Sequence, residues 1–147
     1  MEVKAKLRQA FEEILDKMAF LYFEEEPQPD GPYDFITKIG FQGTISGVIN
    51  IFFTGPAGEQ VARNLVGIRP EDELFPGTVE DALCEFTNMV MGRTLTILDP
   101  DSRFEMEVPT LLREPTPAAA GMETLTLEGL LEEEPCRVLL HYQRAGD

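Results

Sequence analysis

The sequence predicts an α+β fold with about three helices and about five to six strands. Three stretches repeat apolar residues at helical spacing, and several shorter stretches alternate apolar with polar residues. Proline and glycine separate these stretches, as expected of turns. The chain has 147 residues, 43% of them hydrophobic, which is enough for one core, so we expect a single domain over residues 1–147.

Three segments are predicted to be helical. Residues 3–26 repeat apolar side chains every three or four positions until Pro27. The second helix opens at Thr54 with a proline in its first turn and closes at Gly67. The third helix runs from Thr78 to about residue 98. Thr78 and Asp81 have the spacing of a capping box, which would mark its start.

The remaining patterned segments are predicted to be strands. Residues 33–54 contain an alternating run and a second, mostly apolar run rich in β-branched and aromatic residues. Gly43 and Gly47 bracket a short connection between them, which indicates a hairpin. Residues 103–108 alternate as a further strand. A closing hairpin is expected from residues 124–130 and 136–143, with the acidic segment 132–135 as its turn. Residues 115–121 read as a Pro/Ala loop.

The net charge of -15 argues against some partners and favours others. Such an acidic surface repels nucleic acids and anionic membranes, and it attracts proteins that expose Lys or Arg; its simplest role is solubility. The first residues lack the apolar core of a signal peptide. Cys84 and Cys136 lie in apolar patterns, so we expect reduced thiols and a cytoplasmic protein. With one histidine, His141, a zinc site lacks ligands.

One side of the third helix carries a polar stripe. Asp81, Glu85, Asn88 and Gly92 are spaced by four, three and four residues, which places them within roughly 60° of arc. The other sides of this helix are largely apolar. A helix that is apolar on most sides is buried, so the stripe is expected to face water or a partner.

The residue types on this stripe suit the positioning of water. The amide of Asn88 offers one acceptor and two donors, which can hold a water molecule in a fixed orientation. Glu85 can pair with a Lys or Arg of another protein. Gly92 lowers the side-chain wall beside Asn88, so a substrate group can approach. Hydrolysis of a phosphoryl group needs mainly such positioning.

The run from Asp81 to Gly92 resembles the signature of the chemotaxis phosphatases CheX, CheC and FliY, in which Asp or Ser, Glu, Asn and a small residue have the same spacing. The order of elements along most of the chain is similar as well. This resemblance implies a CheC-like fold, in which a mostly antiparallel sheet carries the helices on it.

The resemblance also implies an activity and a partner. The substrate would be the aspartyl phosphate of a CheY-like response regulator. Asn88 would orient the attacking water, and Glu85 would dock the active-site Lys of the regulator. Asp81 and Gly92 would support docking or the motif itself. Mg²⁺ would be held by the regulator, and this protein would need no cofactor of its own.

CheC-type members carry a second copy of the motif on their first helix. The nearest match here is Glu13 followed by Asp16, where an Asn would be required. We therefore expect one site, as in the CheX-like branch. Members of that branch are often dimers, so the resemblance also suggests a homodimer.

Several other interpretations stay open at this stage. The stripe can serve a binding module that holds a response regulator or a flagellar-switch component without hydrolysis. A small-ligand sensor using the first helix and the hairpin is a weaker alternative. Asp81 suits a helix cap as well as docking, Glu85 can be merely solvated, and Asn88 can hydrogen-bond a neighbouring loop.

Overall fold

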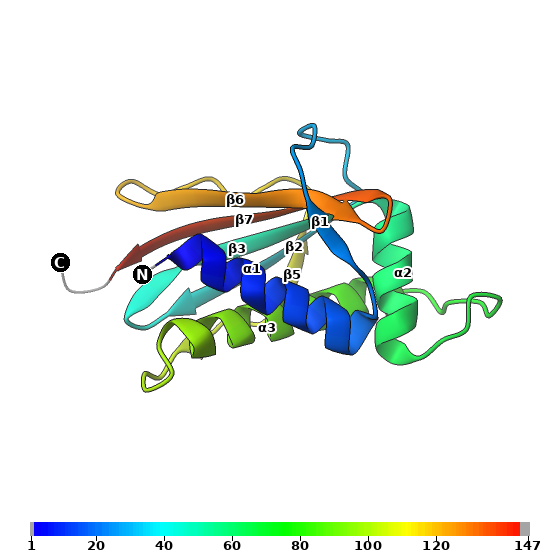
Figure 1. The fold of residues 1–147 in the computed structure, drawn as a ribbon, viewed down its shortest axis with the longest axis horizontal. Coiled ribbons are helices and arrows are strands. Elements are labelled where there is room, and N and C mark those ends of the chain that lie inside the picture. Colours follow the sequence, from blue (N-terminus) through cyan, green and yellow to red (C-terminus); the bar gives the residue numbers. More distant parts are fainter. Residues whose placement is uncertain (1, 145–147) are drawn as a thin grey trace.

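The computed structural model describes residues 2–144 and places three α-helices beside one antiparallel sheet of seven strands (Figure 1). The predicted α+β class is thus confirmed, with one or two strands more than expected. The elements follow in the order α1 (Val3–Ile14), a short π-helix η1 (Leu15–Ala19), β1 (Phe23–Glu25), β2 (Phe35–Gln42), β3 (Ile45–Phe53), α2 (Gly55–Val66), α3 (Thr78–Leu98), β4 (Glu105–Met106), β5 (Thr110–Leu112), β6 (Glu123–Leu131) and β7 (Glu134–Arg144).

The strand order of the sheet is symmetric. The strands run β1-β6-β7-β3-β2-β4, and β5 also pairs with β2. Exchanging β1 with β4, β6 with β2 and β7 with β3 gives the same order reversed. Each half is a helix followed by three of these strands, so α1 corresponds to α3. The amino-acid sequence shows no obvious repeat that would have indicated this.

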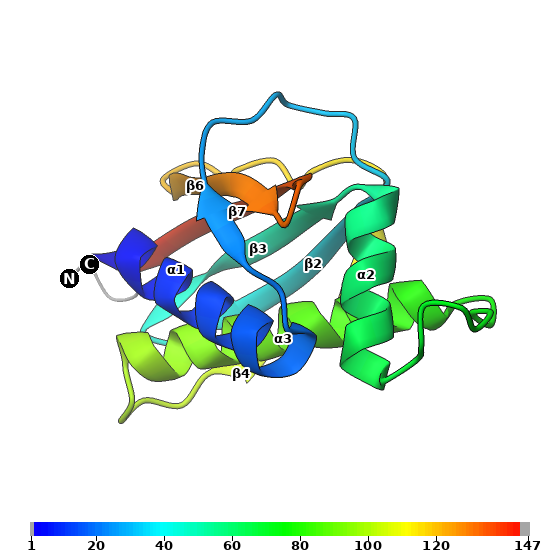
Figure 2. The ribbon, with the colours of Figure 1, turned by 45° about the vertical axis from the view of Figure 1, so that its right-hand side comes forward.

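Helices α1 and α3 pack side by side on one face of the sheet, and α2 stands across its end (Figures 1 and 2). A group of phenyl rings joins these layers. Phe11 of α1 meets Phe86 of α3 edge to face, with ring centroids 6.0 Å apart, and Phe53 of β3 meets Phe86 at the same distance. All three rings are fully buried. The amphipathic pattern of the two helices thus places one long side of α3 against the core.

The first predicted helix is shorter than its pattern indicated. Instead of continuing to residue 26 it ends at Ala19; Phe20 adopts a left-handed conformation, and residues 23–25 form β1. Phe23 pairs with Leu131 of β6 and is buried against Phe11. This long-range pairing outweighs the helical period of the segment.

Two smaller expectations are also corrected. The strand predicted over residues 103–108 is reduced to β4, and β5 follows after Pro109, which has no amide hydrogen for a continuous ladder. Thr78 and Asp81 do not form a capping box. The N-cap of α3 is Gly77 in a left-handed conformation, with φ of 86°, and no side chain caps the helix.

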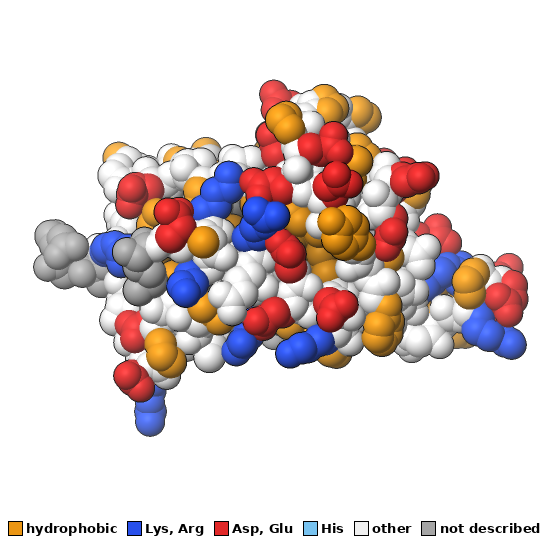
Figure 3. Space-filling model, viewed as in Figure 1, with side chains coloured by type: hydrophobic (Ala, Val, Ile, Leu, Met, Phe, Trp, Pro, Cys, Tyr) orange, Lys and Arg blue, Asp and Glu red, His pale blue; other side chains and the backbone are white. Residues whose placement is uncertain are grey.

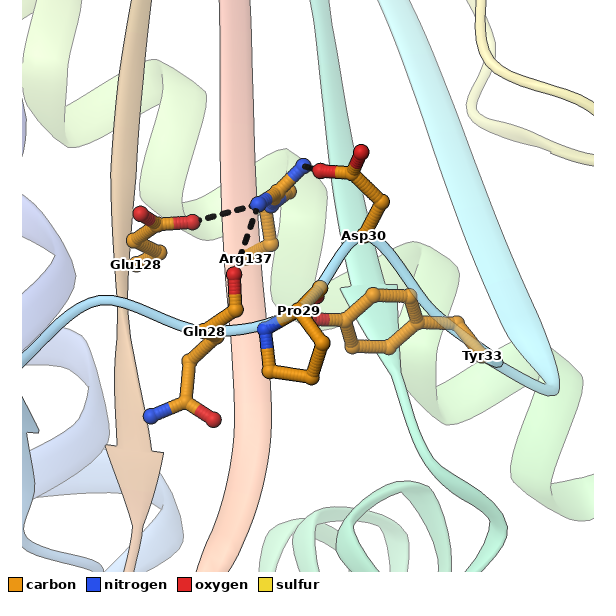
Figure 4. A network of polar contacts seen from close by, with 6 residues as sticks. All are labelled: Gln28, Pro29, Asp30, Tyr33, Glu128 and Arg137. Atoms are coloured by element: carbon orange, nitrogen blue, oxygen red, sulfur yellow. Dashed lines mark hydrogen bonds and ion pairs between the residues drawn. The ribbon is translucent and has the colours of Figure 1, made fainter.

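The outer face of the sheet, opposite α1 and α3, is covered by loops. Arg137 of β7 binds the loop before β2: its guanidinium donates to Asp30 at 2.9 Å and to the carbonyl of Gln28 at 3.2 Å (Figure 4). It also donates to Glu128 of the neighbouring strand β6 at 2.5 Å. Among residues 2–144, no helix is both long and apolar enough to cross a membrane.

Candidate functional site

The four residues of the predicted stripe lie on α3, on the side that the core leaves uncovered. Asp81 and Glu85 are exposed, whereas Asn88 and Gly92 are partly buried. The opposite side of the helix is fully buried, for example at Leu83, Phe86 and Val90. The helical period alone therefore predicted correctly which side of this helix faces outward.

The polar side chains of the stripe are not engaged within the molecule. Among residues 2–144, the side chains of Asp81, Glu85 and Asn88 form no hydrogen bond and no ion pair. The hydrogen bond from Asn88 to a neighbouring loop, one of the open alternatives, is therefore absent from this part of the chain. A partly buried amide with free donors and an acceptor is suited to binding water or a partner group.

Thr87, directly before Asn88, holds the helix to the sheet. Its hydroxyl donates to the carbonyl of Leu83 at 2.8 Å and lies 2.6 Å from the hydroxyl of Thr37 on β2. Both threonines are completely buried. In the sequence, Thr87 is a polar exception on a largely apolar side of this helix, with no assigned role. A buried polar residue needs a partner, and this requirement was the available signal.

This contact continues through the sheet. The side-chain amide of Asn50 donates to the carbonyl of Thr37 at 3.2 Å, and its oxygen accepts from the backbone amide of Thr116 at 2.8 Å. His141 donates from Nε2 to the carbonyl of Thr116 at 2.9 Å, and its Nδ1 lies 2.7 Å from the hydroxyl of Thr124. Hydrogen bonds thus link the site helix to the loop on the outer face.

On the side facing α1, the site helix is joined to Glu13. Arg93 donates to the carboxylate of Glu13 at 2.7 Å, and Gln9 donates at 3.2 Å. The hydrogen bond from Arg93, and then that from Gln9, lowers the pKa of Glu13. Glu13, the counterpart of Glu85 on α1, is therefore engaged in an internal ion pair with Arg93. Asp16, the counterpart of Asn88, is exposed and lies within the π-helix.

On the other side, open space adjoins Gly92. A methyl group added there would meet only the sulfur of Met106, at 4.0 Å, which is an ordinary contact. Gly92, Thr96, Phe104 and Met106 line a shallow hollow of about 260 Å³ together with the turn after α3. Packing within the described chain therefore does not require a glycine here, and the surface one turn after Asn88 is open.

Cys84 is the only potential thiol nucleophile among the described residues of α3. Burial raises the pKa of its thiol, and the charges of Asp81 and Glu80 raise it further. A thiol that stays protonated is a poor nucleophile. No group of three or more potential metal ligands occurs within residues 2–144.

The arrangement therefore offers positioning groups, a carboxylate and an amide, on a rigidly packed helix. Fold and site together define an α+β protein that carries an uncovered carboxylate and amide on a helix packed against its sheet.

Solved structures with a similar fold come from chemotaxis proteins. CheX from Vibrio vulnificus aligns with a TM-score of 0.78 and 20% identity, covering 97% of both chains. CheX in a CheX–CheY–BeF3–Mg²⁺ complex from Borrelia burgdorferi aligns with a TM-score of 0.76 and 18% identity, covering 97% of this chain and 99% of that one. At such identities the likeness demonstrates a common fold.

A more distant likeness is to a flagellar-switch protein. FliM in a FliM–SpeE complex from H. pylori aligns with a TM-score of 0.63 and 11% identity, covering 95% of this chain and 83% of that one. No curated protein sequence matches the chain.

The family model "Chemotaxis phosphatase CheX" matches residues 35–124, which is more than half of the chain and includes the whole stripe. The chain belongs to this family.

Proposed function

We propose that this protein hydrolyses the aspartyl phosphate of a CheY-like response regulator and that the stripe on α3 is its active surface. The observation that carries the proposal is that Glu85 and Asn88 project from a helix buried on its other sides, with no hydrogen-bond partner among residues 2–144. Membership of the CheX family supports the same activity.

In the proposed reaction, Asn88 enters the active site of the regulator and holds a water molecule in line with the phosphorus. The water oxygen forms a bond to phosphorus while the bond to the aspartyl oxygen breaks. The products are a free aspartate carboxylate and inorganic phosphate, which takes up the water protons. The amide is neutral and cannot act as a useful base, so its contribution is orientation.

Glu85 has a separate role in the proposal. Its carboxylate would repel the phosphoryl group but would attract a cationic side chain beside it, so we assign it to the active-site Lys of the regulator. Asp81 and Gly92 would support docking. Mg²⁺, which neutralises charge on the phosphoryl oxygens, would belong to the regulator. The relative from Borrelia burgdorferi was solved with CheY, BeF3 and Mg²⁺, which is consistent with this division.

The test is a dephosphorylation assay with purified response regulators of the host, phosphorylated by a small-molecule phosphodonor in the presence of Mg²⁺. The wild type should accelerate loss of the phosphoryl group from at least one regulator, and Asn88→Ala should lose that acceleration. Gln60→Ala, which removes an exposed amide from α2, is the matched control and should behave as the wild type.

Binding without hydrolysis is the competing function, and FliM middle domains show that a similar fold occurs in a flagellar-switch protein. A complex that forms with wild type and weakens in Glu85→Gln, with equal phosphate loss in wild type and Asn88→Ala, would favour this alternative over the phosphatase.

A further inference from the structure

The turn between α1 and β1 displays a second surface, which the proposed function does not use. The rings of Phe20 and Tyr22 are 71% and 68% exposed, and with Leu21 they line a hollow of about 580 Å³. Phe20 has φ of 56°, a conformation that is rare for a bulky residue. Exposed apolar groups that are gathered in one place are typical of interaction sites.

This hollow continues towards α2. A second hollow of about 330 Å³ is lined by Leu21, Pro56, Leu131 and Glu132, among others. Because Leu21 and Glu132 line both hollows, the two adjoin each other and together make one surface from the end of α1 to the start of α2. We call it the α1–β1 trough. Phe20, Leu21 and Tyr22 are among its apolar lining residues.

The rim of the trough is acidic. Neither hollow is lined by a Lys or Arg of residues 2–144, whereas six carboxylates line them: Glu12, Glu13, Asp16, Glu132, Glu133 and Glu134. Glu12 and Glu13 are paired with Arg8 and Arg93, and the other four form no ion pair with the described residues. Figure 3 shows hydrophobic side chains lying among acidic ones around β1.

We propose that the α1–β1 trough binds a short segment of a partner protein that combines Lys or Arg with apolar side chains. The apolar side chains would bury the exposed faces of Phe20 and Tyr22. The cations would pair with the carboxylates that form no ion pair, two of which, Glu132 and Glu134, already accept one hydrogen bond each, or lie over the rings. Nucleic acids and anionic membranes do not fit, because the rim repels them. Asp81, Glu85, Asn88 and Gly92 do not line the trough, so this surface is independent of the proposed phosphatase site.

The test uses a fluorescein-labelled synthetic peptide in which Arg and Leu alternate, followed by fluorescence anisotropy in about 0.15 M salt. Two control peptides carry Ser in place of Leu or Glu in place of Arg. The protein variant combines Phe20→Ser with Tyr22→Ser. Its control combines Phe75→Ser with Val108→Ser, since both of these side chains are 82% exposed and neither lines the trough. Thermal unfolding verifies that both variants fold.

The Arg/Leu peptide should bind the wild type and the control variant equally, and its affinity for the trough variant should fall about tenfold or more. Both control peptides should bind much more weakly. The proposal is overturned if the Arg/Leu peptide does not bind or if the Arg/Ser peptide binds with equal affinity. It is also overturned if both protein variants lose affinity equally. Each of these results would leave at most non-specific attraction between opposite charges. If the trough variant dephosphorylates the regulator more slowly than the wild type, the trough belongs to the surface that contacts the regulator. That result would also overturn the proposal that the trough binds a different partner.

Discussion

Helices α1 and α3 occupy equivalent positions in the symmetric sheet, yet only α3 carries a Glu and an Asn, Glu85 and Asn88, that both lack internal partners among residues 2–144. On α1, Glu13 is held by Arg93 and Gln9, and Asp16 replaces the amide. The same scaffold can thus carry a polar stripe in one half and a structural ion pair in the other. The two helices have equivalent places in the fold, and they differ in the motif side chains that they carry and in the internal partners of those side chains.

The largest expected effect comes from making the α3 motif identical to that of α1. Asn88→Asp keeps the shape of the side chain but replaces the donor amide with a carboxylate, which repels the phosphoryl group. We expect the dephosphorylation rate to fall by about 100-fold, as for the loss of one positioned donor in other enzymes. Single-turnover assays with phosphorylated regulator measure this. A variant as fast as the wild type would show that α3 does not use the amide.

The second prediction concerns the buried contact that α3 makes through Thr87. Thr87→Val keeps the shape but removes the hydrogen bond with Thr37, so we expect kcat to fall about tenfold with KM unchanged and the free energy of unfolding to fall by about 1 kcal/mol. Thr94→Val is the matched control. Thr94 is equally buried on α3, but its hydroxyl donates only to the carbonyl of Val90. Equal kcat values in the two variants would contradict a positioning role for Thr87.

A smaller effect is expected at the ion pair of α1. Glu13→Gln should lower the free energy of unfolding by less than about 1 kcal/mol, because both partners are substantially exposed and screened. The pKa of Glu13 is lowered in the folded state, so its contribution is complete above the ordinary value of 4.5 and is lost as pH falls through the lowered pKa. Thermal unfolding should separate variant and wild type at pH 7, and the difference should shrink as the pH falls below 4.5. A difference that persists in acid would assign the effect to packing.

The smallest effect is expected from restoring the motif on α1. In an Asn88→Ala background, Asp16→Asn recreates Glu-x-x-Asn on α1, but Glu13 remains paired with Arg93. We expect no recovery of the dephosphorylation rate beyond about twofold, which is below RT in free energy. The same assay as above measures it. A substantial recovery would show that α1 retains a working geometry and that Asp16 alone silences it.

Local patterns predicted the parts of the molecule that depend on neighbours in sequence. Periodicity predicted the extent of α3 and its outward stripe. Turn glycines predicted the hairpin of β2 and β3 and the end of α2 at Gly67. The missed features depend on distant partners. β1 forms because Phe23 meets Leu131, and Thr87 is explained only by Thr37 on a strand fifty positions earlier. No local pattern contains these pairs.

The hydroxyl contact between Thr87 and Thr37 also sets the angle of the site helix. Interlocking apolar side chains hold α3 on the sheet, and the hydroxyl pair adds a contact that also depends on direction. A side-chain tip lies about 5–6 Å from the axis of a helix, so a rotation of about 10° displaces it by about 1 Å. Displacements of that size can reduce a rate by about 100-fold. The hydroxyl pair, one residue from Asn88 and 2.6 Å long, is therefore placed to oppose such a rotation together with the apolar contacts.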